Sequence, residues 1–455
     1  MNSRATRYAA RWVFPVAAPP IRDGAVLVDD TGRIAAVGPA ATVPAPADAA
    51  TVDLGDAALL PGLVNVHGHP ELSILRGLLD DLPFHEWIPG LNRTKRRAAF
   101  APDDYATAAR WTCVEALAAG ITTFGATEDS GGALDALTEA GMRGIVYQEV
   151  FGPAPEQVED SLAGLVRKVE AKRARESDLV RVGVSPHAPY TVSDALFRAT
   201  ADYALAEELP VAVHAAEAEA ETLLVRDGGG PFAEGLRARA IATPPRGRST
   251  IELLDRLGVL RTRPLLIHCV SIDDDDRHRI ADAGAAVAHC PAANARLGHG
   301  VAPLIELLDD GVAVGLGTDS VASNNRLDLF EEARLAQLFQ RARLHSGCVL
   351  PAETLLRLAT LDGARVLGLD DRIGSLEPGK DADLCAVSFA GAHVVPVHDP
   401  ASALFHAARA SDVILTAVRG RVLFRDGRIL SLDADALRPR VEALAARARH
   451  ARADD

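Results

Sequence analysis

The chain has 455 residues, 48% of them hydrophobic, and this length predicts one large domain accompanied by a smaller one. Its 48 Lys and Arg residues against 62 Asp and Glu residues give a formal net charge of −14 at pH 7. An acidic protein repels phosphate backbones and anionic lipids, which argues against nucleic acid or a membrane surface as a partner.

The first residues show no pattern of a secretory signal. An apolar stretch follows Arg4, Arg7 and Arg11, but prolines from Pro15 onward interrupt it. No run of about 18 apolar residues occurs, so we expect no membrane-spanning segment. The five cysteines are scattered and odd in number, which favours reduced thiols in the core. These features predict a cytoplasmic protein.

The two ends of the chain look alike, because both are rich in short β segments. Residues 22–38 read as a hairpin around a turn at 29–32, and residues 412–430 repeat that pattern with two further turns. Residues 374–387 lead through a turn-rich stretch into another short strand. We predict a small β-sandwich built from both chain ends.

In the middle of the chain, eight apolar, β-branched segments alternate with helix-length segments. They occupy residues 60–67, 120–126, 144–150, 180–186, 210–215, 264–269, 285–291 and 312–319. Such strands are typical of a parallel sheet covered on both faces, and helical patterns occur at 106–118 and 159–174. Eight units over about 270 residues match the size of a (β/α)₈ barrel. A doubly wound open sheet is the alternative.

The predicted protein is therefore of the α/β class and has four segments. Residues 60–373 form a TIM-like (β/α)₈ barrel, and residues 1–59 and 374–432 supply the two parts of the β-sandwich. Residues 433–455 are rich in Arg and Ala and predict a C-terminal surface or interface helix.

Polar residues follow the predicted strands at their carboxyl ends. They are His67 and His69 (first strand), His187 (fourth), His214 (fifth), His268 (sixth), His289 (seventh) and Asp319 (eighth). A barrel collects these strand ends on one face, where its active site lies. The sequence thus predicts that these side chains converge.

The residue types point to metal chemistry. His67-Gly68-His69 places two imidazoles on one face of an extended segment, which suits a divalent ion such as Zn²⁺. Glu217 follows His214 closely and can exchange protons with a metal-activated water. His268 is either a ligand or a hydrogen-bonding partner of that water. No lysine ends a predicted strand, so we expect one ion and not a lysine-bridged pair.

Several motifs of this chain resemble the amidohydrolase superfamily, and specifically its deaminase and chlorohydrolase branch. They are PGLVNVHGH (61–69), HAAE (214–217), HC (268–269), HCP (289–291), GTDSVASNN (317–325) and GSLEPGKDADLCAV (374–387). Within the branch, RGLLDDLPFHEW (76–87) and SPHAPYTVS (185–193) are most similar to methylthioadenosine/S-adenosylhomocysteine deaminases. The chain departs from the family at Gly68, where the family more often has a hydroxyl residue.

The resemblance assigns roles to individual residues. It implies metal ligation by His67, His69, His214 and Asp319. It implies that Glu217 is a proton shuttle, that His268 polarises the water or substrate, and that Asp319 is also a base. It further implies that Glu86 holds ribose hydroxyls and that His187 contacts the substrate. Trp87 lies beside Glu86 in a long segment (70–100) that could grip the ligand or simply form a lid.

The resemblance implies a metal-dependent aminohydrolase in which metal-bound hydroxide attacks an aminated heterocycle. Purine nucleosides such as S-adenosylhomocysteine or methylthioadenosine are the favoured substrates. The same site could hydrolyse another C–N or C–Cl bond, as in a triazine, an amide or a cyclic ureide, and a non-catalytic barrel is the remote third reading. Zn²⁺, Fe²⁺ and Mn²⁺ all accept this ligand set, zinc being the first choice. A homo-oligomeric state is an expectation from the resemblance alone.

Overall fold

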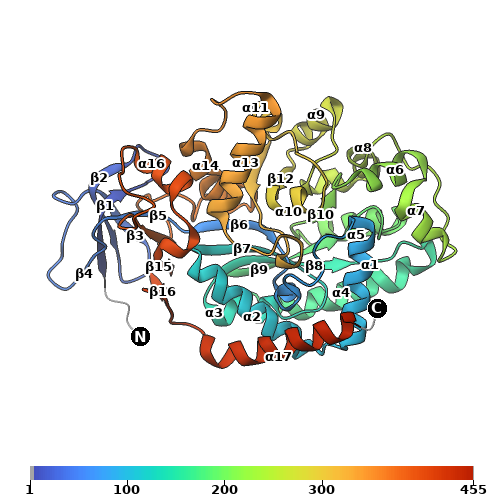
Figure 1. Ribbon diagram of the computed structural model, residues 1–455, viewed down its shortest axis with the longest axis horizontal. Helices are drawn as coiled ribbons and strands as arrows, with labels where there is room; N and C mark the ends of the chain where they lie inside the picture. Colours follow the sequence, from blue (N-terminus) through green and yellow to red (C-terminus); the bar gives the residue numbers. More distant parts are fainter. Residues whose placement is uncertain (1–4, 454–455) are drawn as a thin grey trace.

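A computed structural model describes residues 5–453 of the chain. One large body of alternating strands and helices carries a β-sheet at one side, and a long C-terminal helix runs along its lower edge (Figure 1). The strands of the large body lie in two groups, one early and one late in the sequence.

The eight strands predicted for the middle of the chain are all present. They are β6 (Leu63–Gly68), β7 (Ile121–Glu128), β8 (Arg143–Val150), β9 (Val180–Pro186), β10 (Ala212–Ala215), β11 (Leu265–His268), β12 (Ala286–His289) and β13 (Ala313–Leu316). Within each of two sheets, every strand pairs with the next one along the chain. Strands β6, β7, β8 and β9 form one parallel sheet, and β10, β11, β12 and β13 form another. Almost every residue in them is buried, which explains their continuous apolar runs. The arrangement is a TIM-barrel fold of the α/β class.

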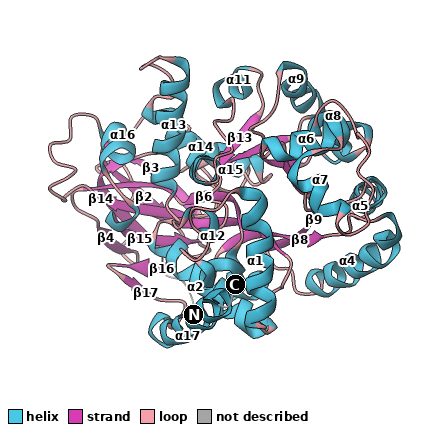
Figure 2. Cartoon of the chain, turned by 45° about the vertical axis from the view of Figure 1, so that its right-hand side comes forward, coloured by secondary structure: helices cyan, strands magenta, loops and turns pink. Residues whose placement is uncertain are grey.

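Helices connect these strands and surround them (Figure 2). The helices of the outer layer are α2 (Pro102–Ala118), α3 (Ala133–Ala140), α4 (Val158–Arg173), α5 (Asp194–Ala206), α8 (Thr250–Arg256), α9 (Asp274–Ala283), α11 (Leu304–Asp309), α13 (Leu329–Leu344), α14 (Ala352–Ala359) and α15 (Leu361–Val366). Helices α2 and α4 confirm the two predicted helical patterns. Side-chain caps define several starts: Ser193 accepts from the amide of Leu196 to begin α5, and Asp273 accepts from that of Asp276 to begin α9.

Further helices stand near the carboxyl ends of the strands. They are the 3₁₀ helix η1 (Pro70–Leu75), α1 (Phe84–Ala98), α6 (Glu219–Asp227), α7 (Gly230–Arg237), α10 (Pro291–Arg296) and α12 (Val321–Asn324). These insertions build the walls of the site described below.

The two chain ends pair in one nine-stranded sheet. Its strands are β1 (Thr6–Val13), β2 (Ile21–Val28), β3 (Ile34–Pro39), β4 (Ala50–Asp53), β5 (Ala57–Pro61), β14 (Leu384–Ser388), β15 (Val413–Val418), β16 (Arg421–Arg425) and β17 (Arg428–Ile429). Strand β14 pairs antiparallel with β5, so the late segment adds directly to the early one. Both predicted hairpin regions are present, as β2–β3 and as β15–β16–β17. The hydrogen bonding links one continuous sheet, and the sandwich arrangement stays a prediction.

The C-terminal helix α17 (Ala434–Ala453) packs against α1 and α2. The predicted helix extends to residue 455, and its last two residues lie outside the described part of the chain. Within residues 5–453, no helix has both the length and the apolar character needed to cross a bilayer. Four of the five free cysteines are buried as expected, and Cys348 is exposed.

Candidate active site

The carboxyl ends of β6, β10 and β13 bring three histidines and one aspartate together. The Nε2 atom of His67 lies 3.3 Å from Oδ1 of Asp319, and that of His69 lies 3.6 Å from the same oxygen. The Nε2 atoms of His69 and His214 are 3.4 Å apart. The prediction that these four side chains converge is confirmed.

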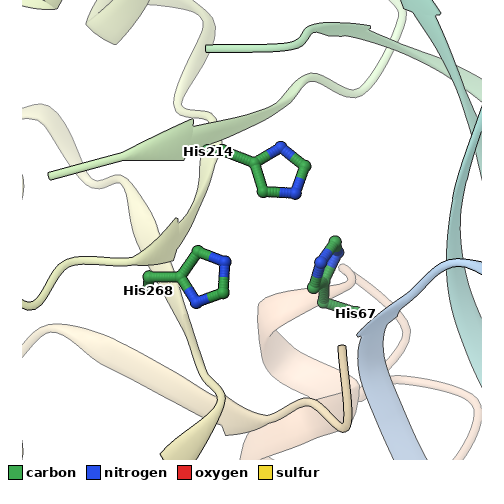
Figure 3. Close-up of side chains that lie close together, drawn as sticks. All are labelled: His67, His214 and His268. Atoms are coloured by element: carbon green, nitrogen blue, oxygen red, sulfur yellow. The ribbon is translucent and has the colours of Figure 1, made fainter. Parts of the chain in front are cut away.

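These separations suit a divalent ion. Two ligands at about 2.0–2.1 Å from a tetrahedral Zn²⁺ stand about 3.3–3.4 Å from each other, as the nitrogen and oxygen atoms do here. Three groups of side chains could hold an ion. Two include His67, one with His69 and Asp319 and the other with His214 and His268, and the third joins His214 to Glu149 and His187. Figure 3 shows the rings of His67, His214 and His268 turned toward a common space. The donor set therefore fits a metal ion.

The backbone is strained where these strands end. His268 and Asp319 have positive φ angles of 77° and 55°, and Ala216 has one of 51°. Such left-handed conformations are costly for residues with side chains and concentrate at functional sites. The structure also explains why this chain has Gly68 where the family more often has a hydroxyl residue. A Cβ at this position would lie 2.8 Å from the ring of Phe124 and 3.0 Å from the carbonyl oxygen of Asp319.

Further hydrogen bonds orient the metal-binding side chains. The Nδ1 atom of His214 donates to the carbonyl oxygen of His187 at 3.2 Å, which leaves its Nε2 as an acceptor. The Nδ1 atom of His67 lies 3.1 Å from the hydroxyl of Thr127. The second carboxylate oxygen of Asp319 accepts from Ser323 at 2.7 Å. Partners of this kind hold ligands in the geometry that an ion requires.

Burial keeps the histidines neutral. Desolvation, reinforced by the nearby His67, lowers the pKa of His69 to about 3. Desolvation likewise lowers the pKa of His187 to about 4 and that of His214 well below its ordinary value. A neutral imidazole is the form that binds metals, so these rings are ready to coordinate at neutral pH.

Glu217 and His268 stand beside this group. The Oε2 atom of Glu217 accepts from the hydroxyl of Tyr190 at 3.1 Å, and its Oε1 lies 3.4 Å from Nε2 of His268. The other nitrogen of His268 lies 2.9 Å from Oδ1 of Asn294. Burial alone would raise the pKa of Glu217, but the His268 and His299 rings hold it below its ordinary value. The carboxylate is therefore ionised and can accept a proton.

A cavity of about 390 Å³ opens onto these side chains. One wall comes from α1, whose Phe84, Trp87, Ile88 and Leu91 face the cavity at helical spacing. Tyr190 adds an aromatic ring on another side. His187 and Trp87, both expected to contact substrate, line the cavity, as do Glu217, His268 and Asp319.

Glu86, which the resemblance assigns to ribose hydroxyls, lies outside the cavity lining of the described residues. Its side chain is 59% exposed, and its Oε1 lies 3.9 Å from Nε2 of His85. The reason is the register of α1: Glu86 follows Phe84 by two residues, which turns it to about the opposite face of the helix. The structure therefore gives no support to a ribose-binding role for Glu86.

Sequence reasoning missed several residues that the structure brings to the cavity or behind it. They are Glu71, Lys95, Asp129, Glu149, Tyr190 and His299. Glu149 and Asp129 belong to the ends of β8 and β7, so the strand-end argument could have found them. The Oε2 atom of Glu71 and Oε1 of Glu149 are buried without a hydrogen-bond partner in the described part of the chain. His289, in contrast, is buried and outside the cavity lining.

Comparison with known proteins places this site in a family. The amidohydrolase family model matches residues 58–423, and the chain belongs to that family. A 5-methylthioadenosine/S-adenosylhomocysteine deaminase of Syntrophobacter fumaroxidans is 37% identical over 91% of this chain and 91% of that protein.

Two solved structures share the whole architecture. An adenosine deaminase from Xanthomonas campestris with bound zinc is 30% identical, with a TM-score of 0.86 and 98% of each chain covered. An atrazine chlorohydrolase from Arthrobacter aurescens complexed with zinc is 26% identical, with a TM-score of 0.84, covering 96% of this chain and 100% of the other.

Proposed function

We propose that this chain is a metal-dependent aminohydrolase that deaminates a purine nucleoside such as 5′-methylthioadenosine or S-adenosylhomocysteine. The observation that carries the proposal is the position of Glu217 and His268, 3.4 Å apart, beside the His and Asp set in one aromatic-walled cavity. The similarity to a deaminase of such nucleosides over nine-tenths of both chains supports the substrate class.

We assign His67, His69, His214 and Asp319 as the ligands of one divalent ion, with zinc as the first choice because both solved relatives carry it. When bound, the ion supplies Lewis acidity and lowers the pKa of a water molecule toward neutrality. Asp319→Asn should therefore reduce zinc content and activity together. Metal analysis of the purified variant tests this, and full zinc occupancy in it would remove Asp319 from the ligand set.

The chain's own side chains handle the protons. Asp319, whose Oδ2 is held by Ser323, is positioned to take a proton from the attacking water. Glu217 accepts the second proton and delivers it to a ring nitrogen, which neutralises the charge that develops there. Asp319 gives its proton to the amino group as the carbon–nitrogen bond breaks, so ammonia leaves and one water converts the amine to a carbonyl. His268 holds the water in line through Nε2.

The cavity suits a flat ring. Phe84, Trp87 and Tyr190 present aromatic surface to a heterocycle, and such stacking stabilises planar ligands. His187, next to Glu149 at 3.8 Å, offers a polar contact on the same side. We propose Trp87 and His187 as substrate-binding residues and leave Glu86 out.

The test is ammonia release by the zinc-loaded protein across aminated heterocycles. The panel contains S-adenosylhomocysteine, 5′-methylthioadenosine, adenosine, guanine, cytosine and an aminotriazine. We expect release from the nucleosides, lost on Glu217→Gln while zinc stays bound. Silence toward every nucleoside by metal-loaded protein would refute the proposal.

Hydrolysis of a halogenated or aminated triazine is the second candidate, favoured by the 26% identity to the atrazine chlorohydrolase over almost the whole chain. Chloride release from a chlorotriazine, measured with the same preparation, separates the two. Chloride release together with no ammonia from nucleosides would favour this candidate.

We also propose the finer architecture. The parallel bridge between Val184 and Val211 and the packing of β13 on β6 support one closed eight-stranded barrel. The barrel would span residues 60–373, with 1–59 and 374–432 as the sandwich and 433–455 as the terminal helix. Limited proteolysis that cuts first near 373–374 would support these boundaries.

A further inference from the structure

His299 lies behind the catalytic carboxylate, at a position that the proposed reaction does not yet use. It follows α10, and its backbone amide donates to the carbonyl oxygen of Asn294 at 2.8 Å. Its side chain is 2% exposed, and its Nε2 lies 3.4 Å from Oε1 of Glu217. The ring packs edge-on against Phe84, with centroids 4.5 Å apart. Glycines with φ of 73° and 111° flank it, a conformation that lets the chain aim the ring inward.

We propose that His299 is a positioning residue that donates its Nε2–H to Oε1 of Glu217 and so orients the proton-shuttling carboxylate. The inference rests on the proposed function, because it assigns a partner to the shuttle of that reaction. His299 does not belong to the lining of the cavity among the described residues. It acts on the substrate only through Glu217.

The need for this donor follows from the hydrogen bonds of Glu217. A buried carboxylate requires donors on both oxygens. Tyr190 supplies one to Oε2 at 3.1 Å. Two ring nitrogens face Oε1, from His268 and His299, each at 3.4 Å.

With the Asn294 amide oriented as in this structure, neutral His268 does not supply the second donor. Its Nδ1 faces the amide oxygen of Asn294 at 2.9 Å, and an oxygen acceptor places the ring proton on Nδ1. Its Nε2 then carries a lone pair toward Glu217. His299 is left as the neutral donor for Oε1. Its Nε2 is buried and makes no hydrogen bond of ordinary geometry within the described chain, so its N–H is available to Glu217 at 3.4 Å.

One short segment therefore controls both catalytic groups. Asn294 at the middle of α10 sets the tautomer of His268, and His299 five residues later faces Glu217. A separation of 3.4 Å is long for an N–H···O bond, and catalytic hydrogen bonds often tighten only when substrate binds.

The decisive experiment compares two substitutions of similar size in the zinc-loaded full-length protein. His299→Gln keeps an N–H donor and His299→Leu removes it. We expect His299→Leu to lower kcat by about tenfold to a hundredfold with KM nearly unchanged, and His299→Gln to retain kcat within about threefold. Equal losses in the two variants, or no loss in either, would overturn the proposal.

The same two substitutions at His289 serve as a control for the effect of replacing a buried histidine as such. His289 is also buried with an Nε2 that lacks a partner among residues 5–453, but no contact joins it to Glu217. The kcat values of His289→Gln and His289→Leu should therefore be similar, because an N–H donor at this position does not reach Glu217. An advantage of Gln over Leu equal to that at His299 would contradict a specific role for His299.

A spectroscopic readout does not depend on catalysis. With ¹⁵N-labelled histidine, the zinc-loaded protein should show His299 as the Nε2–H tautomer, assigned by the signal that disappears in His299→Gln. That signal should shift in Glu217→Gln. A proton on Nδ1 of His299 would overturn the proposal, whether or not any nucleoside is deaminated. Absence of deamination with the Nε2–H tautomer present would instead count against the proposed function alone.

Discussion

The histidines of this site differ in what their second ring nitrogen meets, and that contact determines what the first nitrogen can do. His214 donates from Nδ1 to a backbone carbonyl, so its Nε2 is free to bind an ion. His268 meets a side-chain amide oxygen instead, and its Nε2 faces a carboxylate. Identical residue types at equivalent strand ends thus acquire different chemistry from their immediate partners.

The buried neutral histidines should make the protein acid-sensitive, and His187 offers a test. Desolvation lowers its pKa to about 4 in the folded state, against about 6.5 in an unfolded chain. Between these values the unfolded state binds more protons, so acid favours unfolding. The stabilisation is complete above about pH 6.5 and is lost as the pH falls toward about 4.

The free energy of unfolding should change with pH between about pH 6.5 and 4. We expect His187→Asn to reduce this dependence by the contribution of one proton, about 1 kcal/mol per pH unit. Urea denaturation of the metal-free protein across this interval measures the slope. His278→Asn, on the exposed face of α9, serves as the control and should keep the slope of the unsubstituted protein. A slope unchanged by His187→Asn would show that His187 does not titrate as described.

At the scale of elements, the barrel strands were predictable and the walls of the cavity were not. Every strand from β6 to β13 is nearly fully buried, so its apolar run is visible in the sequence. Polar residues that end such strands, as His67 and Asp319 do, share one face by topology alone. Helix α1 follows no such rule, because its face toward the cavity depends on where it begins and what it packs against.

That dependence accounts for the position of Glu86 outside the cavity lining and for the missed His299. The sequence around Glu86 resembles a family motif, but only about half a turn of helix separates the exposed side of α1 from its cavity-facing side. His299 lies in a connection after α10, whose path is determined by tertiary contacts with Phe84 and Glu217. A histidine between two glycines was its only local signal.

The C-terminal helix should influence substrate binding through α1. Leu444 on α17 is 8% exposed and belongs to the same apolar cluster as Phe84 and Trp87 of α1. Leu444→Ala should cost about 2–3 kcal/mol of packing and loosen the cavity wall. We therefore expect a higher KM with kcat little changed, and faster hydrogen exchange in α1.

The control for this prediction lies on the same helix. Glu442 is exposed on α17, and Glu442→Ala should leave both KM and exchange in α1 unaltered. A similar KM for the Leu444→Ala protein and its control would show that α17 does not support the cavity wall.

On the scale of the whole molecule, the barrel and the nine-stranded sheet are joined by chain continuity and by a buried ionic contact. Strand β5 of the sheet runs into β6 of the barrel with only Gly62 between them. A Cβ at Gly62 would lie 2.1 Å from the hydroxyl of Thr122, so glycine is required there. Because β5 leads into the first residue of β6, the sheet lies at the amino end of the barrel strands, away from the catalytic residues.

Arg143, the first residue of β8, makes the ionic contact between the two parts. Its side chain is 1% exposed, its Nε donates to Asp383 at 2.9 Å and its Nη2 donates to Asp381 at 2.9 Å. Both aspartates precede β14 of the sheet, and Arg372 also binds Asp381. Removing one partner of a buried ion pair leaves an uncompensated charge, which commonly costs about 3–5 kcal/mol.

We expect Arg143→Met to lower the free energy of unfolding by about 3–5 kcal/mol, as measured by denaturant titration of the zinc-loaded protein. Arg143→Lys keeps the charge but loses the paired geometry and should fall between. Zinc content and kcat should persist in the folded fraction, because Arg143 and the cavity-lining Glu149 lie at opposite ends of β8, about 20 Å apart. A loss under about 1 kcal/mol would mean that the aspartates are satisfied without Arg143. Loss of zinc from the folded variant would instead show that the interface and the metal site are coupled along β8.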